Sequence, residues 1–231
     1  MRAARPFDPR FFEEHPLFWP IARAATAFVH DERWPPVETY VRAFPSEPAV
    51  RFEAAAAPPR RRRRTVEPSS LYDARITHDA CVPTRPESWH DFLNALVWAS
   101  FPRSKRALHE RQLRALRACL EPGSRTLPAT RSREHDALAL LDEGGVVVLE
   151  DGRRQDVVLF GHALYEGLVL DRGAMTACAI TAAVGEVPAA EAERVALADG
   201  ALAVHLATAA LEPGKLARMR IPCGTLIRHA D

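Results

Sequence analysis

The sequence lacks the cysteine pairs and long apolar runs that mark several large classes of protein. Nowhere do about 18 uncharged apolar residues follow one another, and the first residues carry charge and proline where a signal peptide needs an apolar run. The cysteines form no C-x-x-C pair, so a cysteine-based zinc site is not expected; they are Cys81, Cys119, Cys178 and Cys223. We therefore expect no membrane span and a cytoplasmic protein with reduced thiols.

Complete catalytic and cofactor motifs are also missing. The sequence contains no serine-hydrolase elbow, no phosphate-binding G-x-x-x-x-G-K and no dinucleotide-binding G-x-G-x-x-G. The charges nearly cancel, with 31 Lys and Arg against 30 Asp and Glu, so no global field would attract nucleic acid. Any binding of an anionic ligand must be local. The length of 231 residues and the hydrophobic share of 47% are sufficient for one sizeable core.

Proline divides the chain into two regions. Eleven of the 19 prolines lie in the first 70 residues, which disfavours long strands and helices there. We predict that residues 1–70 form a Pro- and Arg-rich extended N-terminal arm with one short helix, Pro20 to His30, docked on the body by its aromatic residues. Residues 71–231 are predicted to form a single domain.

Five consecutive arginines stand between prolines near the end of this arm: Arg60, Arg61, Arg62, Arg63 and Arg64. They fit either a phosphate-binding patch for nucleic acid or a solvated linker. Because the rest of the chain has almost no net charge, we favour the linker.

The periodicity of the second region predicts an α+β fold, with helices packed on a mostly antiparallel sheet. Ser88 is expected to cap a helix from Trp89 to about Ser100, and Phe101-Pro102 separates it from a second helix. A hairpin is predicted with its turn at Asp142 to Gly145. The predicted strands are 71–76, 137–141, 146–149, 156–160, 174–184 and 216–228, and the other helices are 104–120, one opening at His162, and 188–211.

Two helical turns carry the side chains best suited to chemistry. His90 and Asn94 lie four residues apart and share a helix face, with Asp91 beside them. His162 and Glu166 have the same spacing, directly after a strand and Gly161. We predict that these five residues, His90, Asp91, Asn94, His162 and Glu166, form a catalytic pocket.

A divalent metal ion is one ligand that this pocket could hold, although we favour an arrangement of the histidines without a metal. His90, His162 and Glu166 offer imidazole and carboxylate ligands, which suit zinc, manganese or iron. Asp142 and Glu143 offer either a general base and further ligands or residues that simply satisfy a turn. The alternative for the histidines is a hydrogen-bonded helical pair and a core histidine without a metal.

Further residues near the His90 helix are predicted to bind a small anionic substrate. Arg103 and Lys105 follow Pro102 and can take negative charge. Trp98 and Arg85 are the other predicted substrate contacts. A solvated helix start explains Arg103 and Lys105 equally well.

Several segments together resemble the DUF3025 family, a bacterial family of unknown function. They are Cys81-Val82-Pro83-Thr84-Arg85, Trp89-His90-Asp91-x-x-Asn94-Ala95-Leu96-x-Trp98, Phe101-Pro102-x-x-Lys105, the predicted hairpin Ala137-Leu138 through Asp142-Glu143-x-Gly145, and Phe160-Gly161-His162-Ala163-x-x-Glu166. The resemblance extends from about His15 to the final strand and implies no activity, substrate or cofactor. One departure is Leu108-His109, where the family pattern leads us to expect Leu-Asn.

These observations favour a hydrolase acting on a phosphorylated or otherwise anionic substrate, with or without a metal. His90 or Glu166 would be its general base, and Asn94 would orient substrate or water. The alternative is a non-catalytic binding or adaptor protein, in which the same residues form a structural polar network. The two hypotheses differ in whether His90 and His162 meet.

Overall fold

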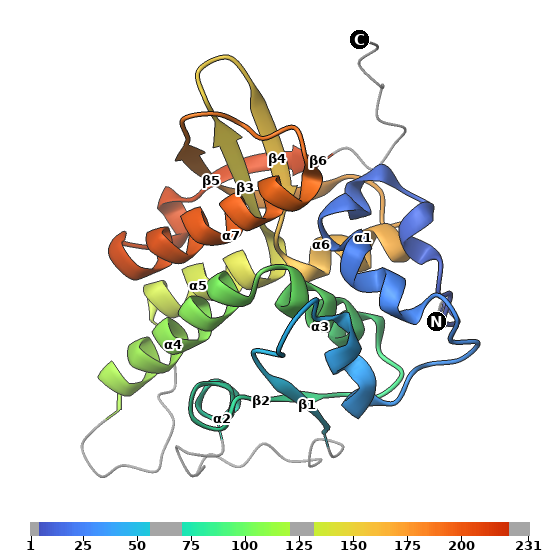
Figure 1. The fold of residues 1–231 in the computed structure, drawn as a ribbon. Coiled ribbons are helices and arrows are strands. Elements are labelled where there is room, and N and C mark those ends of the chain that lie inside the picture. Colours follow the sequence, from blue (N-terminus) through green and yellow to red (C-terminus); the bar gives the residue numbers. More distant parts are fainter. Residues whose placement is uncertain (1–4, 56–70, 121–131, 222–231) are drawn as a thin grey trace.

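The computed structural model describes residues 5–55, 71–120 and 132–221 (Figure 1). Its α-helices are α1 (Trp19–Ala25), α2 (Tyr72–Asp79), α3 (Trp89–Ser100), α4 (Pro102–Ala118), α5 (Arg133–Gly144), α6 (His162–Val169) and α7 (Glu191–Thr208). Its strands are β1 (Arg51–Ala54), β2 (Cys81–Thr84), β3 (Gly145–Glu150), β4 (Gln155–Leu159), β5 (Met175–Ala183) and β6 (Ala217–Ile221). Short 3-10 helices occur at Phe11–Glu13, Pro16–Phe18, Thr26–Phe28, Val37–Ala43 and Pro213–Lys215.

The strands form two sheets, and the predicted α+β class is confirmed. The larger sheet has the order β4-β3-β5-β6, and the smaller one pairs β1 with β2 in parallel. In the larger sheet β3 pairs antiparallel with β4, and β5 pairs antiparallel with β6, but β3 and β5 are parallel. The sheet is therefore mixed, because helix α6 carries the chain back between β4 and β5 and reverses its direction.

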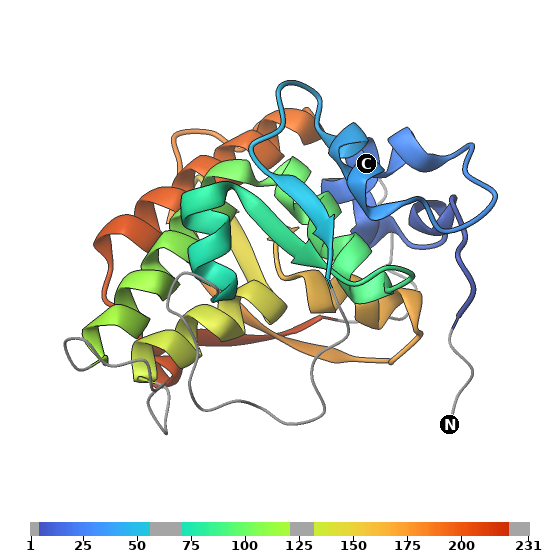
Figure 2. The same cartoon turned by 90° about the horizontal axis from the view of Figure 1, so that it is seen from below.

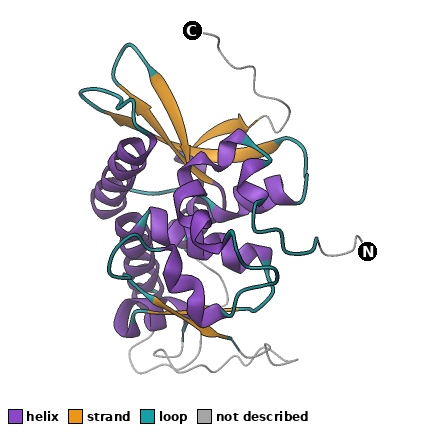
Figure 3. Cartoon of the chain, turned by 45° about the vertical axis from the view of Figure 1, so that its right-hand side comes forward, coloured by secondary structure: helices purple, strands orange, loops and turns teal. Residues whose placement is uncertain are grey.

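Helices fill the space between the two sheets, as Figure 3 shows. Helix α7 contacts β3, β4 and β5, and Arg194 of α7 lies 3.0 Å from Asp156 of β4, which fixes the helix on that face. Helix α4 packs against both α7 and α5, and the three helices run side by side in Figure 2. Helix α3 contacts both α1 and α6. It therefore connects the N-terminal segment to the part of the chain that follows β4.

An aromatic cluster joins the N-terminal segment to α3. The ring of Phe92 lies 5.1 to 6.2 Å from six other rings. These belong to Phe7, Phe11, Phe28, Trp34, Tyr40 and Trp89. Aromatic contacts at such distances add to the stabilisation that burial provides. The surface of α3 around Phe92 is thus covered by aromatic residues from before position 41.

The segment 71–76 was predicted as a strand, but Tyr72–Asp79 forms helix α2. Six residues of weak alternation do not distinguish a strand from a helix, and long-range packing decides the outcome. Asp73 of α2 accepts a hydrogen bond from buried His109 of α4 at 2.9 Å, and Ala74 is completely buried. Ala80, in the left-handed region with φ of 49°, ends the helix.

The predicted hairpin also differs from the structure. Residues 137–141 belong to α5, and the hairpin joins β3 to β4. Ser132 caps α5 by accepting a hydrogen bond from the His135 amide, and Leu138 and Leu141 are buried while Leu140 is 41% exposed. That burial pattern is helical. As a result Asp142 and Glu143 lie in the last turn of a helix and not at a hairpin tip.

Three further predictions, on the arginine run, on the cysteines and on membrane spans, can be compared with the described residues only in part. Arg60–Arg64 and Cys223 lie outside them, so the structure does not bear on a nucleic-acid patch at the arginines. Within those ranges, none of the helices combines the length and the apolar character needed to cross a bilayer.

Phe11→Ala tests whether the N-terminal segment stabilises the rest of the fold. Phe11 is 1% exposed and contacts Phe18, Trp89 and Phe92, so its truncation leaves a cavity. We expect the free energy of unfolding, measured by urea denaturation, to fall by about 3–5 kcal/mol. Val204→Ala, at a position 59% exposed, is the control and should change it by less than about 0.5 kcal/mol. Equal changes in the free energy of unfolding for the two substitutions would show that the aromatic cluster does not stabilise the fold.

Candidate functional site

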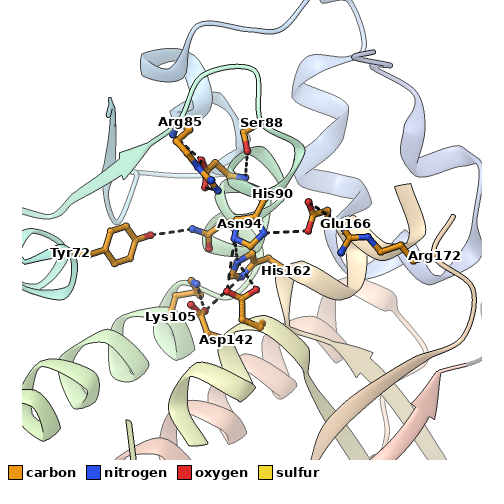
Figure 4. A network of polar contacts seen from close by, with 12 residues as sticks. Tyr72, Arg85, Ser88, His90, Asn94, Lys105, Asp142, His162, Glu166 and Arg172 are labelled. Carbon is orange, nitrogen blue, oxygen red and sulfur yellow. Dashed lines mark hydrogen bonds and ion pairs between the residues drawn. The ribbon is translucent and has the colours of Figure 1, made fainter. Parts of the chain in front are cut away.

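His90 and His162 lie side by side. His90 projects from the first turn of α3, and His162 is the first residue of α6 (Figure 4). Their Nε2 atoms are 3.0 Å apart, and the two rings are nearly perpendicular, with an interplanar angle of 76°. Residues that are 72 positions apart in the chain can therefore address one ligand.

Glu143 completes a cluster of three ligand atoms. Its Oε2 lies 3.4 Å from His162 Nε2, and its Oε1 lies 3.9 Å from His90 Nε2. Together with the 3.0 Å between the two Nε2 atoms, these separations bracket the edge of about 3.3 Å that a tetrahedral site with bonds of about 2.0–2.1 Å would have. Among the described residues, His90, Glu143 and His162 form the group of histidines and carboxylates whose ligand atoms all lie within 4.8 Å of one another.

The far sides of the two imidazoles face carboxylates. Glu166 Oε2 lies 3.4 Å from His90 Nδ1, and Asp142 Oδ1 lies 3.9 Å from His162 Nδ1. A carboxylate behind a histidine is the usual arrangement around a protein-bound metal, because it fixes the tautomer and orients the ring. Glu166, predicted as the third metal ligand, is thus placed behind His90, and Glu143 occupies the third position.

Burial sets the charge of the cluster. It lowers the pKa of His162 to about 3, so this imidazole is neutral at pH 7, which is the form that binds a metal. Burial also raises the pKa of Glu143, although His90 acts in the opposite direction. The side chain of His162 is only 4% exposed, whereas that of Glu143 is 50% exposed. The cluster therefore reaches from the protein interior to solvent.

Lys105 is buried completely behind the cluster. Its Nζ is 2.5 Å from Asp142 Oδ1 and 5.6 Å from the centre of the Trp98 ring. Burial alone would raise the pKa of Asp142, but Lys105 and the neighbouring histidines outweigh it and hold this pKa below its ordinary range. Lys105 is enclosed by protein and paired with Asp142, so its position gives no support to its predicted role as a substrate contact.

The other predicted site residues are spread more widely. Asn94 is 6% exposed and donates from Nδ2 to the Tyr72 hydroxyl at 3.4 Å, beside His90. Asp91 accepts hydrogen bonds from the Arg85 amide at 2.9 Å and from its Nε at 2.6 Å, which holds the loop that precedes α3.

Trp98 and Arg103, two predicted substrate contacts, have their neighbours away from His90 and His162. Trp98 is completely buried and stacks on His109, with ring centres 5.5 Å apart. Arg103 lies against α7, where its amide donates to Asp199 and its guanidinium would be 3.1 Å from a Cβ at Gly200. Both roles as substrate contacts are therefore unsupported by their positions.

Sequence reasoning gave Glu143 and Asp142 only a minor place, because it assigned them to a turn. The helix cap at Ser132, followed by acidic residues in the first turn, was the feature that could have identified α5. A helix that ends at Gly144 next to Gly161 brings both carboxylates to the start of α6.

The fold and this cluster define an α+β protein with a histidine–carboxylate centre that spans α3, α5 and α6. The family model described as "Protein of unknown function (DUF3025)" matches residues 62–155, so this part of the chain is similar to that family. The matched part includes His90, Lys105, Asp142 and Glu143, whereas His162 and Glu166 follow it. No curated protein and no solved structure shows significant similarity to the chain.

Gly161→Ala tests the close backbone contact between Gly161 and residues 143–145, which brings Glu143 near His162. Gly161 has an ordinary φ of −66°, but a Cβ there would lie 2.5 Å from the Glu143 carbonyl oxygen and from two backbone nitrogens. The backbone from Glu143 to Gly145 must shift, so we expect the free energy of unfolding to fall by about 1–3 kcal/mol. Gly185→Ala, where a Cβ meets nothing within 4 Å, is the control. Unchanged stability of Gly161→Ala in chemical denaturation would contradict this packing.

Proposed function

We propose that the protein is a metal-dependent hydrolase whose single divalent ion binds to His90 Nε2, His162 Nε2 and a carboxylate oxygen of Glu143. The observation that carries the proposal is the convergence of these three ligand atoms while both Nδ1 atoms face other carboxylates. Two histidines and one carboxylate leave coordination positions open for water and substrate.

The charges around the cluster fit a divalent cation. Asp142, Glu143 and Glu166 supply three carboxylates, and the cations that contact them are Lys105 and Arg172. If the imidazoles carry no charge, these five side chains together have one net negative charge. A divalent ion would change that to one net positive charge. Imidazole and carboxylate ligands suit zinc, manganese or iron.

A hydrolytic reaction fits such a centre. A divalent ion held by His90, His162 and Glu143 would lower the pKa of water toward neutrality and would so supply a nucleophile for hydrolysis. Glu166, which is 18% exposed and contacts His90 Nδ1, would orient the His90 ring toward the metal ion. Asn94 would orient substrate or water from the same face of α3. Glu143, half exposed, is the ligand nearest to solvent, so substrate would approach from its side.

Two arginines support an anionic substrate. The side chains of Arg85 and Arg172 are 59% and 53% exposed, and Figure 4 shows them on different sides of His90. Arg172 Nη2 is 3.6 Å from Glu166, which leaves most of its donors free for a phosphate or carboxylate group. Arg85 is held by Asp91 and is therefore preorganised.

A binding protein without catalytic activity is the second candidate. The distance of 3.0 Å between the two Nε2 atoms also fits a hydrogen bond from one neutral imidazole to the other. In that case the cluster would be part of a buried polar network that includes His109 with Asp73 and Lys105 with Asp142. Such a network needs no metal.

Metal content distinguishes these two candidates. We expect purified protein, exposed to zinc or manganese and then dialysed, to retain about one ion per chain by elemental analysis. His90→Ala and His162→Ala should each remove most of it, whereas the exposed His30→Ala should not. A wild-type protein that retains no more metal than the His162→Ala variant would favour the metal-free network.

Hydrolysis can be tested with chromogenic phosphate monoesters, phosphodiesters and carboxylate esters. We expect metal-dependent turnover of at least one of these classes, and a loss of at least about 100-fold in kcat for Glu143→Gln, because an amide is a weaker metal ligand. Arg172→Gln should instead raise KM with little change in kcat. Turnover that persists after complete chelation of metal would show that the reaction uses a different mechanism.

A further inference from the structure

Lys105 carries a positive charge in a place where it has no contact with solvent. It lies in the first turn of α4 and is 0% exposed, and burying an ammonium is unfavourable unless a carboxylate compensates for it. Asp142 of α5 provides that carboxylate at 2.5 Å. A buried ion pair contributes little net stability compared with a well-packed apolar pair. Stability alone is therefore a weak explanation for this pair.

Asp142 is shared between Lys105 and His162. The same oxygen, Oδ1, lies 2.5 Å from Lys105 Nζ and 3.9 Å from His162 Nδ1. His162 Nδ1 is itself buried and has no hydrogen-bond partner of ordinary geometry, although the Asp142 backbone also interacts with this ring. When Nε2 of a histidine binds a metal ion, the proton must reside on Nδ1, and this N–H needs an acceptor. Asp142 is the carboxylate that faces it.

We propose that Lys105 and Asp142 are a positioning pair for His162. The ammonium holds the Asp142 carboxylate behind the imidazole, which keeps the proton on Nδ1 and directs the unprotonated Nε2 toward Glu143 and His90. Lys105 thereby increases the metal affinity of a site that it does not touch. This inference rests on the proposed metal site and explains why a charged pair is retained in the interior.

A substitution of both partners separates positioning from folding. Asp142→Leu alone leaves the Lys105 ammonium buried without a partner, and we expect it to destabilise the protein strongly. Lys105→Met together with Asp142→Leu replaces the pair by apolar side chains and should restore most of the stability. The metal dissociation constant of the folded double variant should nevertheless be about 10–100 times that of the wild type.

Arg111 and Glu134 provide a matched control. They also join α4 to α5 through an ion pair, at 2.6 Å, but Arg111 otherwise contacts the Leu206 carbonyl of α7 and neither His90 nor His162. Arg111→Met together with Glu134→Leu should leave metal affinity unchanged. Binding is measured with Co²⁺ by competition against a chromophoric chelator, and the visible absorption of the bound Co²⁺ reports ligand geometry, which a purely structural pair would not change.

The outcomes distinguish this inference from the proposed function. If the wild type binds neither Zn²⁺ nor Co²⁺, the metal site is wrong and the inference fails with it. If the wild type binds Co²⁺ and the folded double variant binds it with the same affinity and spectrum, only the inference is overturned. If the double variant does not fold, Asp142→Asn is the second variant: weaker binding and an altered Co²⁺ spectrum in folded protein support positioning, and wild-type values refute it.

Discussion

The candidate site depends on the contact between the start of α6 and the junction of α5 with β3. The amides of Phe160 and Gly161 both donate to the Gly145 carbonyl, at 3.0 and 2.8 Å. A side chain at Gly161 would overlap the Glu143 carbonyl. Only a glycine lets the two backbones approach so closely, and this approach brings Glu143 within reach of His162. Packing of α3 on α6 then brings His90 next to His162 and Glu143.

Helix α3 separates two kinds of environment. Phe92 faces the aromatic cluster of the N-terminal segment, whereas His90 and Asn94 face a polar interior. That interior contains ionisable groups which are buried but paired, as buried polar groups generally are. His109, where the sequence departs from the expected family pattern, pairs with Asp73 and stacks on Trp98. Its role is thus in the packing of α2 on α4, behind the histidine cluster.

Several elements could be placed from the sequence alone. Helix α3 with its Ser88 cap, the helix that opens at His162, and strand β5 all lie close to their predicted positions. The short segments 71–76 and 137–141 were assigned to strands, yet both are helices. A six-residue weak alternation and a five-residue apolar run each fit either structure, and only packing against α4 and the sheet decides between them. The parallel pairing of β3 and β5 likewise depends on a long connection that local patterns do not specify.

What the sequence determined by itself is the pairing of side chains within single turns. His90 with Asn94, and His162 with Glu166, share a face because residues four apart in a helix always do. The tertiary structure alone decided that the two turns meet, that Glu143 and not Glu166 joins the two Nε2 atoms, and that Lys105 is enclosed behind them. These outcomes depend on contacts between residues as far apart as 76 positions, and such contacts follow from the packing of whole helices.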